Sequence, residues 1–445
     1  MHNMFNFLSL GSAHHSMIWR LALPIMLSNI SVPLLGLVDT AILGHLNDSR
    51  YLAAVAMGAS LFTFVFWSFA FLRMGTTALV AQNFQNDQRL INIMQSALLL
   101  GLSIGVILFL IAPFFGQALV NLIGAVQHIE PLALEYLLIR FDMAPAVLMN
   151  YALLGYFIGM GKTHIPLILL VTCNVVNGIL NYVFVYHLDL NSAGVAYASN
   201  IAEGLQLVLG FVFLIRQLNL FSQSPLLGFK QHLGHFFNIN SQLFIRTLFL
   251  LFTFAFFMKQ GAMHSDVMLA ANAILINLLM FMSNALDGFA IASESMVGKA
   301  VALKQHKTIK SIIKVSGLWS FLCALLFSLL LLIFHDSILQ LLTSQTEVLA
   351  LLDALTPWLI LLPLAGFASY WLDGIYIGLA QVRQMRNSIL FAVFVLFLPL
   401  QYLLQSWTYH GLWLAFFAFL LGRAAWQLGV LTASLEESAN KVSQC

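Results

Sequence analysis

Long apolar runs separated by short polar breaks dominate this chain. A helix that crosses a bilayer needs about 20 mostly apolar residues, and strands of soluble proteins are much shorter. Counting the runs between the breaks predicts an all-α polytopic membrane protein with about twelve transmembrane helices. These predicted helices span 17–43, 52–81, 91–115, 132–159, 164–186, 194–215, 240–260, 266–298, 311–334, 350–379, 387–407 and 411–433.

The longest polar break lies near the middle of the chain. Residues 217–239 hold Ser222, Ser224, Pro225 and Lys230, a composition typical of a connecting segment. We therefore expect two lobes of six helices each, residues 1–216 and residues 240–445, joined by a cytoplasmic linker at 217–239.

The two lobes resemble each other in sequence. Leu52-Ala53-Ala54-Val55-Ala56 recurs about 217 positions later as Leu269-Ala270-Ala271-Asn272-Ala273, as expected of an internal repeat. Single residues recur at nearly the same offset: Pro145, Gly155, Gly159 and Gly194 have counterparts in Pro363, Gly374, Gly378 and Gly411. Repeats with the same helix order predict pseudo-symmetric lobes, an arrangement that transporters use to build a central site.

Composition supports a membrane setting and excludes several function classes. Hydrophobic residues make up 61% of the chain and charged residues only 8%, against about 25% charged residues in a soluble domain. The formal net charge of +2 and the lack of a basic run argue against nucleic-acid binding. Cys173, Cys323 and Cys445 are far apart, which argues against a disulfide framework or a metal cluster. The expected environment is a lipid bilayer.

Basic residues predict the orientation. Alternate loops carry Arg89, Lys162, Arg216, Lys230, Lys299, Lys304, Lys307, Lys310, Lys314, Arg383 and Arg386, and the other loops carry only Arg50. Because cytoplasmic loops are enriched in Lys and Arg, both termini should be cytoplasmic. Residues 1–16 contain no Lys or Arg, so the first run is expected to remain as a helix rather than to be cleaved as a signal peptide.

The first predicted helix holds two candidates for function. Asp39 lies toward its outer end with no basic neighbour in the same helix. A charge inside a membrane is costly, so burial should favour the protonated carboxyl, which could then carry a proton inward. An interfacial or capping role is the alternative for Asp39. Pro24 should kink the helix, as a hinge or as a static bend.

Amides in the fifth predicted helix are candidate partners of Asp39. Asn177 and Asn181 are four residues apart and share a helix face, with Asn174 nearby. Their expected roles are to hydrogen-bond Asp39 or to bind a cation; the alternative is that they only join helices. Ser199, in the sixth helix, can add a hydroxyl.

The second lobe has its own polar set: Lys259, Asp287, Glu294 and Asp373. Asp287 and Glu294 lie two turns apart on one face, and Lys259 is a plausible ion-pair partner of Asp287 because opposite charges should pair in lipid. Asp373 is a candidate second ion or substrate site; a structural charge network is the alternative for this set. The partners of Arg73, Arg140 and Arg246 stay open, with Asp142 a local candidate for Arg140.

Enzymatic activity is not expected. Gly159-Met160-Gly161-Lys162-Thr163 lacks the first glycine of a nucleotide-binding loop. No pattern typical of a metalloprotease or of a Ser-His-Asp hydrolase is present in the sequence. We expect neither a cofactor nor a resident metal ion.

Several stretches resemble the multidrug and toxic compound extrusion family, and within it the DNA-damage-inducible branch. They are Leu269–Ala273, Ala285–Ala290 with Glu294, Tyr136–Arg140, Ala144-Pro145, Asn150-Tyr151 and Gly155–Gly159, together with Pro24 and Asp39 in the first helix. The resemblance covers residues 17–433. It implies export of small organic, cationic and amphipathic compounds in exchange for protons or sodium, by a monomer in a bacterial inner membrane.

The resemblance also implies residue roles. The first-helix carboxylate of the family falls on Asp39, its kinking proline on Pro24, and its cation-coupling amide and hydroxyl on Asn177 and Ser199. Asp373 matches a second-lobe carboxylate. Relatives in this branch often carry Asp where this chain has Asn181. One carboxylate fewer favours proton coupling and leaves sodium at Asp39 as the alternative.

Flipping of a lipid or a lipid-linked saccharide is the alternative function. A cavity for anionic head groups should be lined by several Lys or Arg, and Arg73, Arg140 and Arg246 keep this reading open. The acidic set Asp39, Asp287, Glu294 and Asp373 favours cationic cargo instead.

Overall fold

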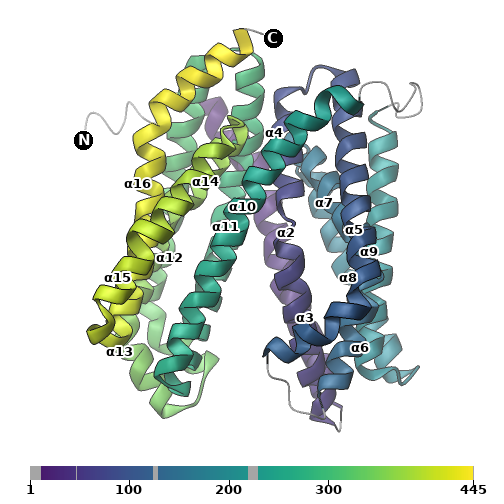
Figure 1. Ribbon diagram of the computed structural model, residues 1–445, viewed down its shortest axis with the longest axis vertical. Coiled ribbons are helices and arrows are strands. Elements are labelled where there is room, and N and C mark those ends of the chain that lie inside the picture. The colour runs from purple at the N-terminus through teal and green to yellow at the C-terminus, as the bar shows by residue number, and fades with distance from the viewer. Residues whose placement is uncertain (1–11, 47, 124–128, 219–228, 444–445) are drawn as a thin grey trace. The chain divides into compact units, whose positions relative to one another are not determined.

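The computed structural model describes residues 12–46, 48–123, 129–218 and 229–443, which form helices joined by short turns, without a strand among them (Figure 1). Ten helical segments of this part of the chain are long and apolar enough to cross a membrane. Helix α2 (Ser12–Gly44) and the pair α6 (Glu130–Phe141) and α7 (Ala144–Gly159) cover the two remaining predicted runs. The prediction of an all-α polytopic membrane protein is confirmed.

The N-terminal unit comprises Leu27–Asn240. In it, α7 packs against α4, α5 and α9, and α8 packs against α9. Besides the second part of α2 and the pair α6 and α7, its helices are α3 (Ser49–Trp67), α4 (Phe71–Gln82), α5 (Asp87–Ile123), α8 (His164–Tyr186) and α9 (Asn191–Ile215).

The C-terminal unit comprises Met1–Met26 together with Ser241–Cys445. Its central helix α13 (Thr346–Gly378) packs against α11, α12 and α16. The start of α2 belongs to this unit, because Ile18, Leu21 and Ala22 share a core with Phe289 of α11. The other helices are the part of α10 (Phe229–His264) from Ser241 onward, α11 (Asp266–Ala302), α12 (His306–Leu342), α14 (Val382–Phe391), α15 (Leu398–Leu403) and α16 (Thr408–Ser443).

The two units repeat each other in local detail. Helices α7 and α13 are followed by residues with positive φ, 69° at Gly161 and 53° at Ala380. At these two ends, the Lys162 amide donates to the Phe157 carbonyl over 2.8 Å, and Gln381 donates to Tyr376 over 2.9 Å. Both are the 6→1 bond of a Schellman cap. The shared cap supports the pseudo-symmetry that the sequence repeats predicted.

Two predicted runs are interrupted in the structure. The run 52–81 breaks between Trp67 and Phe71, where the Ser68 hydroxyl donates to the Val65 carbonyl over 2.6 Å and so competes with helical backbone bonding. The run 132–159 breaks at Asp142 and Met143, because Pro145, at the start of α7, has no backbone N–H to donate to the Phe141 carbonyl and so cannot continue α6.

Two further segments differ from the expected helices. Residues Ala392–Phe397 form a π-helix; Pro399 follows it and has no backbone N–H for a regular helical bond. The second part of the predicted linker 217–239 is helical, since α10 begins at Phe229. The rest of that linker, residues 219–228, lies outside the described residues.

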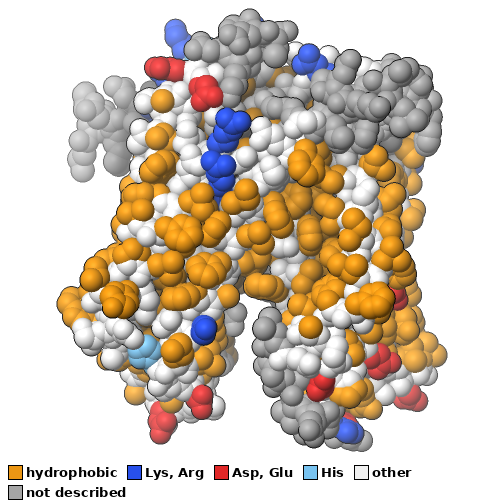
Figure 2. Space-filling model, in the orientation of Figure 1, with side chains coloured by type: hydrophobic (Ala, Val, Ile, Leu, Met, Phe, Trp, Pro, Cys, Tyr) orange, Lys and Arg blue, Asp and Glu red, His pale blue; other side chains and the backbone are white. Residues whose placement is uncertain are grey.

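Outward-facing apolar side chains mark the surfaces that contact lipid. On α5, Leu110 is 59% and Phe114 86% exposed; on α12, Leu326 is 56% and Ile333 68% exposed. Figure 2 shows hydrophobic side chains over much of the visible surface, with charged groups mostly toward the helix ends. Contact between lipid tails and such apolar surfaces carries no free-energy cost, whereas contact with water is unfavourable.

Candidate functional site

In the N-terminal unit, α2 and α8 bring Asp39 together with the predicted amides. The Asn181 amide donates to Asp39 Oδ1 over 2.5 Å and to Asn177 Oδ1 over 2.9 Å. Asn177 in turn donates to the Ser199 hydroxyl over 2.9 Å, and Ser199 donates to the Val195 carbonyl over 3.0 Å. The four residues proposed from sequence therefore form one chain of hydrogen bonds.

Helical spacing explains this arrangement. Asn177 and Asn181 are one turn apart on α8, so their side chains project from the same face. Both are buried, at 1% and 0% exposure, while Asp39 is half-buried. The Oδ1 atom of Asn181 is buried and has no hydrogen-bond donor. The chain of hydrogen bonds thus ends at Asp39, and the Oδ1 acceptor of the adjacent Asn181 remains unused.

Two more polar contacts join α2 to α8. Asn174 donates to the Ser31 hydroxyl over 2.8 Å, and the Tyr186 hydroxyl donates to the Ile42 carbonyl over 2.8 Å. Asp39 lies between these two contacts along α2. Its hydrogen bond with Asn181 is therefore the middle one of three contacts between the helices, and a change in the charge of Asp39 acts on it.

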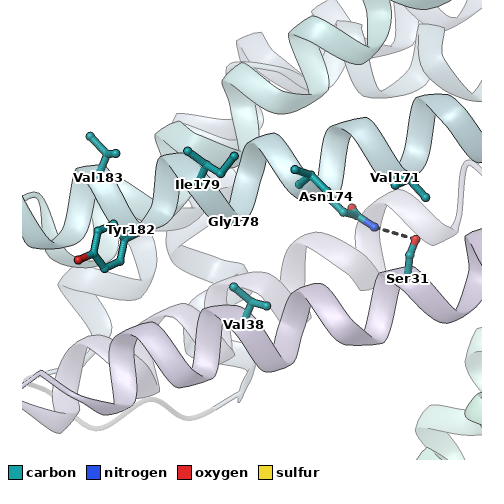
Figure 3. A pocket seen from close by; sticks show the side chains of 9 residues that line it. Ser31, Val38, Val171, Asn174, Gly178, Ile179, Tyr182 and Val183 are labelled. Atoms are coloured by element: carbon teal, nitrogen blue, oxygen red, sulfur yellow. Dashed lines mark hydrogen bonds between the residues drawn. The ribbon is translucent and has the colours of Figure 1, made fainter.

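A pocket of about 550 Å³ runs along the same two helices (Figure 3). Its walls are mainly apolar, and Ser31, Asn174 and Tyr182 supply its side-chain polar groups. Val38, the neighbour of Asp39 in sequence, forms part of the wall. The other lining residues are Val171, Val175, Gly178, Ile179 and Val183. An apolar pocket with few polar groups is the usual form of a site for an organic ligand.

An ion pair that the sequence analysis left open lies beside this chain. Arg140 bonds Glu203 through two nitrogens, over 2.6 Å and 2.9 Å, and the Asn200 side-chain oxygen over 2.6 Å. Arg140 also lies over the Phe62 ring, 4.1 Å from its centroid. The expected local partner Asp142 is instead the C-cap residue of α6.

Glu203 was missed as a candidate. It is the only Asp, Glu, Lys, Arg or His in the predicted span 194–215, so the cost of a charge in the membrane could have singled it out. Asn200, which bonds Arg140, follows Ser199 directly in α9. The hydrogen-bond chain from Asp39 and the Arg140–Glu203 pair therefore meet at consecutive residues of one helix.

Asp373 occupies the centre of a buried network in the C-terminal unit. Arg246 and Arg423 both bond its Oδ2 atom, the latter over 2.7 Å, and Gln427 donates to Oδ1 over 2.7 Å. Two guanidinium groups already neutralise this carboxylate. Of the two roles considered for Asp373, this geometry fits the structural charge network and not a cation site.

The proposed pairing of Lys259 with Asp287 is wrong. Only Ser265 separates α10 from α11. At 1.5 Å per residue, Lys259 lies ~9 Å and Asp287 ~33 Å from that turn, which keeps their α-carbons at least ~24 Å apart. Lys259 is exposed, Asp287 is half-buried and Glu294 is buried in α11. Pairing by charge alone ignored how far each residue lies from the turn.

Pro24 lies within α2, which continues through it as a helix. The boundary between the two units falls between Met26 and Leu27, just after this proline. In the C-terminal unit, Met26 and Ala22 pack so closely on Gly288 that a Cβ at Gly288 would overlap them. This part of α2 is thus anchored to α11.

Comparisons with known proteins give consistent results. The MatE family model matches residues 24–183 and 242–403. DNA damage-inducible protein F of Escherichia coli (strain K12) is 37% identical over 410 residues, 91% of this chain and 89% of the relative. The probable multidrug resistance protein NorM of Acinetobacter baylyi is 32% identical over 198 residues, 43% of each chain.

Solved structures share the fold. The crystal structure of a eukaryotic MATE transporter superposes with a TM-score of 0.86 at 14% identity, covering 96% of this chain and 99% of that chain. A MATE protein crystallised in a bent conformation gives 0.84 at 19% identity, covering 97% and 98%.

Proposed function

Since the chain belongs to the MatE family of multidrug and toxic-compound efflux transporters, we propose that it exports small organic, cationic compounds in exchange for protons. Asp39 is the coupling residue of this proposal, and Asn177, Asn181 and Ser199 hold it in place. The observation that carries the proposal is the hydrogen-bond chain that ends at Asp39 beside an apolar pocket.

The unused oxygen of Asn181 supports a proton as the coupling ion. Ionised Asp39 accepts a hydrogen bond from the Asn181 amide nitrogen. A protonated carboxyl is itself a donor, and rotation of the amide would turn the free Oδ1 atom toward it. Both protonation states of Asp39 then have a hydrogen-bond partner in Asn181.

Sodium is the less favoured ion. Its usual ligands are oxygens, and Asp39 would be the only carboxylate among those at this site. The positive charge of Arg140 also acts on Asp39. A proton bonds directly to the carboxylate and needs no further ligand, whereas a sodium ion brings the same unit charge and needs several oxygen ligands as well.

Exchange follows if ion and substrate compete. An organic cation in the pocket is stabilised by ionised Asp39 and loses this attraction when Asp39 is protonated. Asp39 lies on α2, and residues of α2 also line the pocket. A proton on Asp39 or a substrate in the pocket can therefore bias the position of that helix. We propose Pro24 as the point where α2 bends, because the boundary between the two units, between Met26 and Leu27, falls just after it.

The flippase alternative has less support. It relied on Arg73, Arg140 and Arg246 as binding groups for an anionic head group. Two of these arginines, Arg140 and Arg246, are bonded to carboxylates, those of Glu203 and Asp373. A carboxylate partner already supplies the negative charge that a head group would bring.

The test is dye efflux from everted membrane vesicles, driven first by a proton gradient and then by a sodium gradient. We expect the proton gradient alone to drive efflux, and Asp39→Asn to reduce that efflux by at least about tenfold. Asp189→Asn is the matched control, an exposed acid at a positive φ of 53° that Asn tolerates. Efflux that ignores both gradients, or that survives Asp39→Asn at equal expression, contradicts the proposal.

A further inference from the structure

A buried cluster in the C-terminal unit has more hydrogen-bond donors than acceptors. We call it the arginine cluster; it consists of Arg246 from α10, Asp373 from α13, Ser388 from α14, and Arg423 and Gln427 from α16. All five residues belong to one compact unit. The proposed export mechanism gives no role to the arginines of this cluster.

Asp373 is the only charged acceptor in the arginine cluster. Its Oδ2 atom accepts hydrogen bonds from Nη2 of both arginines, and its Oδ1 atom accepts one from the Gln427 amide. An arginine that binds a carboxylate side-on uses Nε as well as Nη2. Neither arginine does so here, because one oxygen atom is shared between them.

Three guanidinium nitrogens are therefore left over: Nε of Arg246, and Nε and Nη1 of Arg423 are buried and have no partner. The Gln427 Oε1 acceptor is also unpartnered, so none of these nitrogens reaches it. Buried polar groups in proteins are almost always hydrogen-bonded, and those of a charged group are the costliest to leave unpaired.

The charges of the cluster do not cancel either. Two guanidinium groups and one carboxylate give a formal charge of +1. Asp287, on α11, acts electrostatically on Tyr370, as do both arginines and Asp373. Asp287 can offset part of the excess charge, but it does not bond any of the three free nitrogens. What the cluster lacks is an acceptor that carries negative charge.

We propose that the arginine cluster binds a small monovalent anion such as chloride. The anion accepts hydrogen bonds from the free nitrogens of Arg246 and Arg423 and balances the second arginine, while Asp373 balances the first. This site is separate from the coupling chain at Asp39, which lies in the other unit.

Exposure limits the size of this ligand. Arg423 is 1% exposed, which leaves no room for a lipid head group or a drug-sized acid. The Arg246 and Asp373 side chains are 8% and 9% exposed, so the cluster is reached from their side. A halide-sized ion can lose its water at this site only because several charge-assisted hydrogen bonds replace that water.

The test measures unfolding of the full chain in nanodiscs of zwitterionic phosphatidylcholine. Chloride replaces gluconate at constant ionic strength; gluconate is too large and too hydrated for a buried site. A ligand that binds only the folded protein raises its stability, so chloride should raise Tm by roughly 2–5 °C. Equal Tm values in chloride and gluconate overturn the proposal. The readout needs no transport, so it does not depend on the export mechanism.

Two variants and a second measurement localise the effect. Arg246→Gln leaves one arginine for one carboxylate, so Tm should no longer depend on chloride. Arg386→Gln is the matched control. Arg386 lies in the same unit and bonds Gln242 and Asn387 rather than the arginine cluster, so its chloride response should equal that of the wild type. If Arg246→Gln does not fold, crystals of the wild type in bromide decide the question. An anomalous peak beside Arg246 and Arg423 supports the site, and its absence refutes it.

Discussion

Asp39 and Asp373 are both aspartates within apolar helices, one in each unit, yet their surroundings are opposite. Asp39 accepts a hydrogen bond from one neutral amide, that of Asn181. Asp373 is bonded by two guanidinium groups and an amide. A carboxylate can take up a coupling ion only where its neighbours leave its charge uncompensated. Residue type and helix position alone do not separate these two cases.

The largest expected effect is on stability at Asp373. Asp373→Asn removes the only carboxylate between Arg246 and Arg423 and leaves both positive charges buried. Breaking a buried pair in this way costs about 3–5 kcal/mol of unfolding free energy. Thermal unfolding of the purified protein measures it. Asp39→Asn serves as the comparison, because its side chain can still accept from Asn181 and should change stability by less than ~1 kcal/mol. Similar losses in both variants would remove the distinction between the two aspartates.

A smaller loss of stability is expected at the other ion pair. Glu203→Gln takes the carboxylate from Arg140, which keeps Asn200 as a partner. Glu203 is 21% exposed, so water can replace part of the lost bonding, and we expect a cost of about 1–3 kcal/mol. Glu135→Gln, at an exposed position of α6, should stay within about 0.5 kcal/mol. If Glu203→Gln leaves the unfolding free energy unchanged, the Glu203 carboxylate does not contribute to stability through Arg140.

Asn181 tests the choice of ion. Asn181→Asp places a second carboxylate beside Asp39, which supplies the charge that a sodium ion requires. We expect a sodium gradient to drive efflux in this variant and not in the wild type. Asn174→Asp adds the same charge near Ser31, and its ratio of sodium-driven to proton-driven efflux should remain that of the wild type. Efflux by Asn181→Asp that stays indifferent to sodium would argue against charge as the basis of ion choice.

The smallest effect is expected at Ser199. Ser199→Ala removes one acceptor of Asn177, at the far end of the hydrogen-bond chain, where Asn177 and Asn181 separate it from Asp39. A neutral hydrogen bond contributes about 0.5–1.5 kcal/mol, so proton-driven efflux should fall by less than about tenfold. Ser60→Ala, which removes a bond only to its own helix at an exposed site, should leave the rate unchanged. A loss as large as that in Asp39→Asn would make Ser199 a direct participant in coupling.

Helical periodicity explains why the site in the N-terminal unit was predictable. Asn177 and Asn181 share a face in any α-helix, and an aspartate buried nearby needs a donor. Their contact with Asp39 and Ser199 is present in the structure. For the C-terminal unit the same reasoning paired Lys259 with Asp287 by charge alone. It failed because the two residues lie at very different distances from the turn at Ser265.

The sequence by itself determined the class of fold, the two repeats and the residues able to carry charge inside the membrane. These properties depend on local chemistry. A helix that crosses a lipid bilayer needs a long apolar run, and a charged residue within such a run is costly enough to indicate a functional or structural role. Only the tertiary structure decided which charges are neutralised. Arg140 meets Glu203 from α9, and Asp373 meets Arg246 from α10 and Arg423 from α16. Such partners come from helices distant in sequence, because packing of whole helices brings them together.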